Sequence, residues 1–253
     1  MDRERHGEGS SSPSVKLTVT SLYGGTEKEG SNPVCRVALS NGSSFFISPS
    51  DLLSLGFVRG SELSPADYAL LVTAHRRRRI KTKALELMSR RDHCRRELIG
   101  KLEQKFLYPQ RKPNSPPPPK LSEIDKEEIH SLCHEAGDEL VRLGIIDDLR
   151  YAQNWVELRL KRHPEGLGAL EAGLAKRGVE RATIQEVLSP YREGEMDNDA
   201  LERAGEKLLR RSKMNGPKLM RSLMAKGFSY PEIRRWLEAK GIDPRGLEPE
   251  EWD

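Results

Sequence analysis

The chain has 253 residues, of which 36% are hydrophobic and 32% charged, and its formal net charge is +4. It contains no run of about 18 apolar residues and no secretory signal pattern, so we expect neither a membrane span nor a secreted protein. Its three cysteines, Cys35, Cys94 and Cys133, lie far apart. This spacing predicts reduced thiols and a cytoplasmic protein.

The small net charge conceals a separation of charge along the chain. Residues 65–112 carry a net charge of +9, and residues 113–196 a net charge of −5. Within residues 200–240, 11 side chains are basic and 4 are acidic. Two basic segments on either side of an acidic one favour an extended polyanionic or mixed-charge partner.

The first predicted structure is a small antiparallel sheet within residues 15–63, after a polar tail at residues 1–14 that we expect to be disordered. Apolar and polar residues alternate over 15–20, which is typical of a half-buried strand. Two more β-type runs, 34–39 and 44–47, enclose an Asn-Gly pair, a strong hairpin signal. So small a sheet should pack on the helices that follow.

After the sheet, the rest of the sequence carries signals that are typical of helices. Ser50 or Asp51 is the expected cap of a first short helix, which Gly56 ends. Downstream, capping residues, glycines and prolines divide the sequence into three units of three helices, and Pro190 is expected to stop the last helix of unit two. The predicted boundaries are 64–144 for unit one with a proline-rich insertion at 109–119, 145–196 for unit two, 197–240 for unit three and 241–253 for a C-terminal tail.

One pattern recurs in all three units: two leucines four residues apart, then a basic residue three positions later, followed in two copies by glycine and a hydrophobic residue. The leucines should line one stripe of a helix that the glycine ends in a left-handed conformation. We therefore predict a mainly α fold, an elongated tandem array of three three-helix repeats preceded by a small antiparallel β element. The copies are Leu98, Leu102, Lys105; Leu170, Leu174, Arg177, Gly178, Val179; and Leu219, Leu223, Lys226, Gly227, Phe228.

The sequence offers no convincing catalytic arrangement. It lacks a nucleophile paired with a base and a phosphate-binding glycine loop, and Asp147 with Asp148 is explained by helix capping. We expect no enzyme, no catalytic residue and no cofactor. His130, Cys133 and His134 are within one helical turn, but their neighbourhood lacks a full ligand set, so an ordinary helix surface is preferred and no metal is predicted.

Cations in units one and three form the predicted contact surface for a partner or for DNA phosphates. Four consecutive arginines cover most of a helix circumference, so either the helix projects there or one arginine folds its stem along the core. Aromatic residues are sparse among the cations, and Tyr151 and Trp155 are expected in the core of unit two. The candidate residues are Arg76, Arg77, Arg78, Arg79, Lys81, Lys83, Arg90, Arg91, Arg95, Arg96, Arg203, Lys207, Arg210, Arg211, Lys213, Lys218, Arg221, Arg234 and Arg235.

Three segments of the chain resemble the RecX family, whose members regulate the RecA recombinase. The likeness covers about residues 60–240, and the strands before it match more loosely. Two departures are the proline-rich insertion and Cys94, which stands where the family often has serine. The residues that carry the likeness are Ala84, Leu87, Arg90, Glu97, Leu98, Lys101, Leu102; Ile146, Asp147, Asp148, Tyr151, Ala152, Arg159; and Leu223, Lys226, Gly227, Phe228, Ile233.

The resemblance implies a cytoplasmic monomer that binds the RecA filament on single-stranded DNA. It would modulate the recombinase, ATPase and co-protease activities of RecA in homologous recombination and DNA repair, by inhibiting them. The alternative is a helical-repeat protein that binds DNA or RNA directly, without RecA. Replacing Arg76 to Arg79 by alanine is expected to weaken binding to the filament or to DNA without unfolding the protein.

Overall fold

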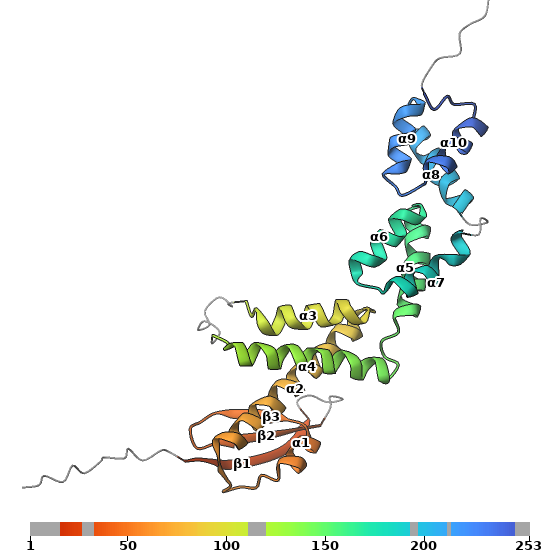
Figure 1. The fold of residues 1–253 in the computed structure, drawn as a ribbon. Coiled ribbons are helices and arrows are strands. Elements are labelled where there is room, and N and C mark those ends of the chain that lie inside the picture. The colour runs from red at the N-terminus through yellow and green to blue at the C-terminus, as the bar shows by residue number, and fades with distance from the viewer. Residues whose placement is uncertain (1–15, 27–32, 111–119, 193–196, 212–213, 246–253) are drawn as a thin grey trace, which may run out of the picture. The chain divides into compact units, whose positions relative to one another are not determined.

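The computed structural model describes residues 16–26, 33–110, 120–192, 197–211 and 214–245 (Figure 1). The predicted N-terminal tail lies outside these residues, as do most of the proline-rich insertion and the end of the C-terminal tail. Of the helices in the described ranges, none is both long and apolar enough to span a membrane.

The described residues form a short sheet followed by a series of helices, which confirms the predicted mainly α class with a small antiparallel β element. The strands are β1 (Leu17–Thr26), β2 (Pro33–Leu39), β3 (Ser44–Ile47) and β4 (Glu62–Leu63). The helices are α1 (Pro49–Leu55), α2 (Pro65–Arg90), α3 (Arg95–Leu107), α4 (Glu123–Arg142), α5 (Asp148–Arg162), α6 (Leu167–Arg177), α7 (Arg181–Arg192), α8 (Asp197–Arg211), α9 (Gly216–Met224) and α10 (Tyr230–Ala239).

The chain divides into two compact units. The first comprises Met1–Lys83 and Leu121–Leu132, and the second Ala84–Lys120 and Cys133–Asp253. The sheet, α1 and the first parts of α2 and α4 belong to the first unit, and all of α5 to α10 belongs to the second. In chain order the three helical triplets are α2 to α4, α5 to α7 and α8 to α10.

The sheet has the strand order β3-β2-β1-β4, with antiparallel neighbours throughout. Gly42 turns the β2–β3 hairpin at a φ of 82°, as the Asn-Gly pair predicts. β4 was not predicted, because two residues are too few for a periodic signal. One face of the sheet is covered by Leu71 and Ala74 of α2, so the sheet and this helix share a core (Figure 1).

The start of α1 differs from the prediction of a cap at Ser50 or Asp51. Ser48 is the N-cap, and its hydroxyl accepts a hydrogen bond of 3.0 Å from the Asp51 amide. Proline at the first helical position explains the shift, because its missing N–H needs no partner there. Gly56 ends the helix in the left-handed conformation, as predicted.

Each of the last two triplets closes around its own apolar core. Both cores hold leucines of the recurring pattern: Leu170 and Leu174 in one, and Leu219 and Leu223 in the other. Asp147 caps α5, and Ser229 with Glu232 forms a capping box at the start of α10. The leucine stripe therefore faces inward in both repeats, as its spacing predicts.

The prediction that Pro190 stops α7 was wrong, since the helix continues to Arg192. Pro190 removes the amide that would bond to the carbonyl of Glu186, an exposed residue whose carbonyl lies near the helix end. Tyr191 packs against the core of the second triplet, and this contact favours a further part-turn of helix. Packing here outweighs the cost of a proline in the last turn.

The glycine of the recurring pattern does more than end a helix. Val179 N–H donates to the Leu174 carbonyl at 3.2 Å, and Phe228 N–H donates to the Leu223 carbonyl at 3.3 Å. These matching bonds close the turns after α6 and α9, with Gly178 and Gly227 at φ values of 86° and 85°. Each turn then meets the start of the middle helix of the preceding triplet.

These contacts make two junctions between successive triplets. At the first junction the Cys94 thiol, at the start of α3, donates to the Arg177 carbonyl over 3.0 Å. At the second, the Gly166 amide at the start of α6 donates to the Lys226 carbonyl over 2.9 Å. The basic residue of the pattern thus contributes its carbonyl to the junction in both copies.

Candidate functional site

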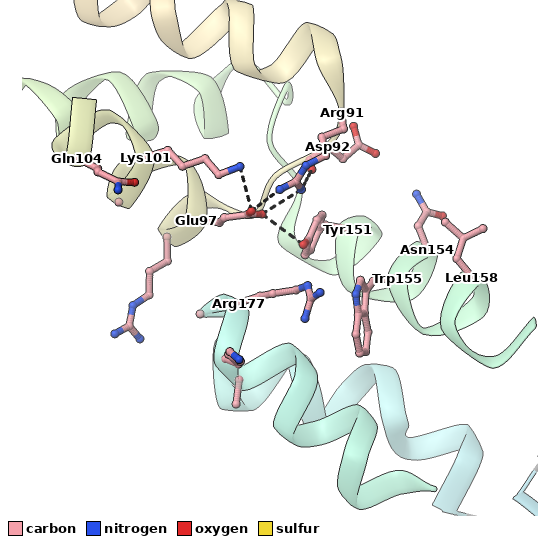
Figure 2. A pocket seen from close by; sticks show the side chains of 15 residues that line it. Arg91, Asp92, Glu97, Lys101, Gln104, Tyr151, Asn154, Trp155, Leu158 and Arg177 are labelled. Carbon is pink, nitrogen blue, oxygen red and sulfur yellow. Dashed lines mark hydrogen bonds and ion pairs between the residues drawn. The ribbon is translucent and has the colours of Figure 1, made fainter. Parts of the chain in front are cut away.

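The candidate site is a groove of about 880 Å³ beside the first junction, in the second compact unit (Figure 2). Five of its lining side chains are basic and two are acidic, so the groove carries a net positive charge. We call it the α3–α5–α6 groove. It is lined by Arg91, Asp92, Arg96, Glu97, Gly100, Lys101, Gln104, Tyr151, Asn154, Trp155, Leu158, Ala175, Lys176, Arg177 and Gly178.

Helix ends hold the three walls of the groove together. The Arg95 amide at the start of α3 donates to the Asp148 carboxylate at the start of α5, over 2.8 Å. Asp147 caps α5 by accepting a hydrogen bond from the Arg150 amide over 2.9 Å. The paired aspartates were predicted as helix caps, and the structure confirms this for Asp147 while Asp148 also joins α5 to α3. Burial raises the pKa of Asp148, against the lowering effect of the Arg95 amide.

Glu97 is the centre of the ion pairs in the groove (Figure 2). Its carboxylate accepts from Arg91 Nη2 at 2.5 Å, lies 3.3 Å from Lys101 Nζ and accepts from the Tyr151 hydroxyl at 3.4 Å. Burial acts to raise the pKa of Glu97, but the Arg91 hydrogen bond and the neighbouring His93 outweigh it and lower this pKa to about 2. Glu97 is therefore an anion at every physiological pH.

His93 is the buried neighbour of this ion-pair centre. Its side chain is 2% exposed, and Nδ1 lies 3.1 Å from a Glu97 oxygen, outside hydrogen-bond geometry. Burial lowers the pKa of His93, with Glu97 acting in the opposite direction. The imidazole is thus neutral near pH 7, and the positive charge of the groove comes from its lysines and arginines.

Trp155 forms an aromatic wall of the groove that is already covered by a cation (Figure 2). The Arg177 guanidinium lies 4.6 Å from the ring centroid, a cation–π distance. The ring edge packs on Gly173, where an added Cβ would lie 2.4 Å from the indole. Tyr151 is buried and Trp155 half-buried against the core, which agrees with the predicted core position of both residues.

Two cations of the groove have no ion-pair or hydrogen-bond partner among the described residues. These are Arg96, at the start of α3, and Lys176, near the end of α6, and both are exposed. The stem of Arg96 lies against Gly178, so its guanidinium is held at the edge of the groove. The site therefore combines neutralised and unpaired cations within one hollow.

The predicted cations of unit one are distributed over both compact units. Arg76, Arg77, Arg78, Arg79, Lys81 and Lys83 belong to the first, and Arg90, Arg91, Arg95 and Arg96 to the second. Only Arg91 and Arg96 of the predicted residues line the groove.

Arg76 does not extend into solvent. Its guanidinium forms ion pairs with Asp125 and Glu128 of α4, and Glu128 also accepts from the Thr73 hydroxyl. Burial acts to lower the pKa of Arg76, but the hydrogen bonds that its guanidinium donates to Asp125 and Glu128 outweigh it, so this pKa is raised. Replacing Arg76 would leave two carboxylates without their cation, so the four-arginine substitution cannot be assumed to spare the fold.

Three further arginines of this segment pair with nearby acids. Arg77 lies 3.5 Å from Asp51, Arg90 bonds to Glu86 at 2.5 Å, and Arg95 bonds to Asp138 at 2.6 Å. Exposed pairs of this kind contribute about 0–1 kcal/mol each, so they do not prevent a cation from exchanging its partner for a phosphate.

In the third triplet the predicted cations lie on the surface. Lys207, Lys218, Arg221 and Arg235 have no acidic partner among the described residues, whereas the others pair with acids one helical turn away. The side chains of Arg211 and Lys213 lie outside the described residues. The pairs are Arg203 with Asp199 at 3.6 Å, Arg210 with Glu206 at 2.8 Å, and Arg234 with Glu238 at 2.7 Å.

Sequence reasoning did not assign Glu97, Lys101, Lys176, Arg177 or Asn154 to the site. Lys101 is one of the residues that carry the family likeness, and Arg177 belongs to the recurring pattern. Both were interpreted as parts of the repeat structure. One signal could have found Arg177: the basic residue before a helix-ending glycine lies next to a junction in any stacked repeat.

The metal candidate around Cys133 is assembled only in part: ligand atoms of His130, His134 and Glu103 lie within 4.8 Å of one another, and Cys133 is not among them. Cys133 is buried, and burial raises the pKa of its thiol to about 12, which disfavours the thiolate that binds metals. Asp138 accepts from Arg95, and His134 lies 3.6 Å from Glu103. All three cysteines are free thiols within the core.

Comparison with known proteins agrees with this architecture. The family model "RecX, second three-helix domain" matches residues 147–188. A regulatory protein RecX of Chlorobium phaeobacteroides (strain BS1) is 29% identical over 157 residues, 61% of this chain and 89% of that protein. Another, of Streptococcus sanguinis (strain SK36), is 30% identical over 103 residues, 38% of each chain.

Two solved structures share the fold. A crystal structure of regulatory protein RecX aligns with a TM-score of 0.62 at 18% identity, covering 88% of this chain and 99% of the other. RecX from Lactobacillus salivarius aligns with a TM-score of 0.50 at 20% identity, covering 65% of this chain and 96% of the other. The fold and its groove thus define a tandem three-helix-repeat protein. By these matches, the chain is similar to RecX regulatory proteins in both sequence and fold, which supports the RecX family.

Proposed function

We propose that this chain binds the RecA recombinase as a filament on single-stranded DNA and restrains its recombinase, ATPase and co-protease activities. The observation that carries the proposal is the basic α3–α5–α6 groove, lined by two successive triplets of a RecX-family chain. A nucleoprotein filament presents phosphates and protein carboxylates together, and a groove with five cations suits such a surface.

The repetition of the fold supports the same proposal. A filament repeats one subunit at regular intervals, and a chain built from tandem three-helix units can offer successive units to successive subunits. The third triplet adds Lys207, Lys218 and Arg221, which are exposed. Together with the groove, these residues supply cations at two separated points of the second compact unit.

The ATPase activity of RecA on single-stranded DNA provides the direct test. Increasing amounts of this chain should lower the steady-state rate of ATP hydrolysis until a plateau is reached. Substituting Lys207 and Lys218 by glutamine should shift the titration to higher protein concentrations, since these exposed cations have no acidic partner in the part of the chain that the structure describes. A rate that stays constant in excess protein would contradict the proposal.

A second candidate function is direct binding to DNA or RNA without RecA, which the unpaired Arg96 and Lys176 favour. A pull-down of RecA with and without nuclease separates the two functions. A protein-protein contact survives nuclease treatment, whereas co-purification through a shared nucleic acid is lost. Loss of RecA after nuclease treatment would favour the second candidate.

A further inference from the structure

We propose that the α3–α5–α6 groove binds the sugar–phosphate backbone of single-stranded nucleic acid directly. In the free protein, the Glu97 carboxylate occupies the position between Arg91 and Lys101 that a phosphate group takes in the complex. This inference rests on the proposed function for its biological setting. It goes further by naming the element that meets the nucleic acid and the internal anion that competes with it.

The donors around Glu97 are those that a phosphate group requires. One carboxylate is held by a guanidinium, an ammonium and a phenolic hydroxyl, from Arg91, Lys101 and Tyr151. Charge-assisted bonds from arginine and lysine are the usual means of holding phosphate oxygens. Arg91 and Lys101 are 52% and 37% exposed, so both can turn from Glu97 towards an incoming anion.

Unpaired cations beside this centre provide the initial attraction. Arg96 and Lys176 lie at the edge of the same groove, on two different helices. They line the same hollow as Arg91 and Lys101, so their positive charge acts on any polyanion that enters it. Asp92, Gln104 and Asn154 are exposed along the groove, so the hollow is open to solvent and admits a chain that passes through it.

The aromatic residues indicate that the backbone, rather than the bases, is recognised. Two guanidinium groups lie near the Trp155 ring, Arg177 at 4.6 Å and Arg159 at 5.9 Å from its centroid, and the ring edge is packed on Gly173. Tyr151, the other aromatic residue among those that line the groove, is buried, so the groove offers little aromatic surface for a base to stack on. Binding should therefore be nearly independent of base sequence.

A nucleic acid fits the groove better than an acidic protein segment does. Leu158 is the only large apolar side chain that is exposed among the lining residues. Protein interfaces usually have an apolar centre that aromatic or aliphatic anchors fill, whereas phosphate contacts need none. The groove therefore matches a partner that binds by charge.

The test measures binding of the full chain to fluorescent dT oligomers by anisotropy, without RecA, over a series of salt concentrations. The groove variant is Arg96→Gln with Lys176→Gln. Its control is Lys105→Gln with Arg181→Gln, which removes the same charge from exposed sites on α3 and α7 outside the groove. The groove variant should bind at least about tenfold more weakly at low salt, and its salt slope should fall by about 1.4, or 0.7 for each lost phosphate contact.

Equal losses in the groove and control variants would overturn the proposal, because they would show attraction by net charge alone. Oligomers of dT and dA should bind with similar affinity. A strong preference for one base would contradict backbone recognition. Displacement of the DNA by polyglutamate at equal charge concentration would overturn the choice of nucleic acid over an acidic protein segment.

Glu97→Gln tests the role of the internal anion. Removing this charge releases Arg91 and Lys101 and should tighten binding several-fold at low salt, whereas Lys101→Gln should weaken it. Weaker binding by a folded Glu97→Gln variant would refute the role assigned to Glu97. If thermal melting shows that the Glu97→Gln variant is unfolded, the Lys101→Gln variant alone tests the site. Unchanged DNA binding by the Lys101→Gln variant would then refute the site.

The inference and the proposed function fail in different ways. If the groove variant loses DNA binding while the wild-type chain leaves RecA ATPase unchanged, the groove assignment stands and the proposed function is wrong. If the wild-type chain inhibits RecA and the groove variant binds DNA like its control, the proposed function stands and the groove assignment is wrong.

Discussion

The two junctions between successive triplets occupy equivalent positions but are built differently. At the first, the turn after α6 meets side chains of α3: the thiol of Cys94 and the stem of Arg96. At the second, the turn after α9 meets the backbone of α6. Gly166 N–H donates to the Lys226 carbonyl at 2.9 Å, and Gly168 N–H donates to the Gly227 carbonyl at 3.1 Å.

This difference explains why the groove lies beside the first junction. A side chain between two turns holds the helices apart, and its charged end remains beside them, as Arg96 does against Gly178. At the second junction a Cβ on Gly166 would lie 2.4 Å from the Gly227 carbonyl oxygen, so no side chain fits there. A repeated position can thus produce a rigid contact in one copy and a binding hollow in the other.

The largest effect should come from Gly227→Ala, which breaks the second junction. Alanine at a φ of 85° is strained, and its Cβ would lie 2.2 Å from the backbone nitrogen of Ala169, which cannot move aside. We expect a loss of at least about 3 kcal/mol. The control is Gly241→Ala, which has a φ of 67° and open space around the Cβ, and should cost about 1 kcal/mol. Thermal melting by circular dichroism measures both, and equal shifts would contradict the close backbone contact.

The next largest effect should come from Glu97→Gln, which removes the ion-pair centre beside the first junction. The pKa of Glu97 lies near 2, below its ordinary value of 4.5, so its charge stabilises the folded chain above pH 4.5 and ceases to do so as the pH falls towards 2. The variant should lose about 2 kcal/mol at neutral pH. The difference in melting temperature between wild type and variant should shrink below pH 4.5, and a difference that stays constant down to about pH 2 would contradict the assigned pKa.

A smaller effect is expected from Gly178→Ala at the first junction. Its φ of 86° is as unfavourable for alanine as that of Gly227, but the atoms that its Cβ would meet are Cδ, Cγ and Cβ of Arg96, which belong to a side chain and not to the backbone. We expect a loss of about 1–2 kcal/mol. The double variant with Arg96→Ala should recover part of it, and a double-mutant cycle of melting data measures that coupling. Strictly additive losses of stability would show that residue 178 and Arg96 do not interact.

The smallest effect should come from Cys94→Ser. A hydroxyl can donate to the Arg177 carbonyl in place of the thiol, and it can also cap α3, whose N-cap Cys94 makes no side-chain capping bond. We expect a change in stability of less than about 1 kcal/mol. Cys94→Ala removes the donor and should cost about 1–2 kcal/mol. If alanine and serine destabilise the chain equally in thermal melting, the bond to Arg177 contributes nothing.

Local features were predicted from the sequence with good accuracy. The β3 strand, the turn at Gly42, the end of α1 at Gly56 and the Asp147 cap follow from turn chemistry and periodicity that are complete within a few residues. The errors occurred where a distant contact decides the outcome. α7 continues past Pro190 because Tyr191 packs against the core, and β4 exists because Leu63 pairs with Leu17.

The candidate site was predicted only in part, for the same reason. Runs of arginine and lysine mark a cationic chain, but they do not show which cations have acidic partners. Arg76 pairs with carboxylates 49 and 52 residues away, and Lys176 belongs to a groove whose other walls are α3 and α5. Sequence spacing contains no information on such pairs.

The sequence by itself determined the tandem helical frame, because leucine spacing, caps and helix-ending glycines act over one or two turns. The tertiary structure decided how the repeats join and where the cations gather. Gly178 and Gly227 have the same local conformation, yet one faces a flexible arginine and the other a backbone. That difference arises from the partner helix, which lies more than 50 residues away in the chain at each junction.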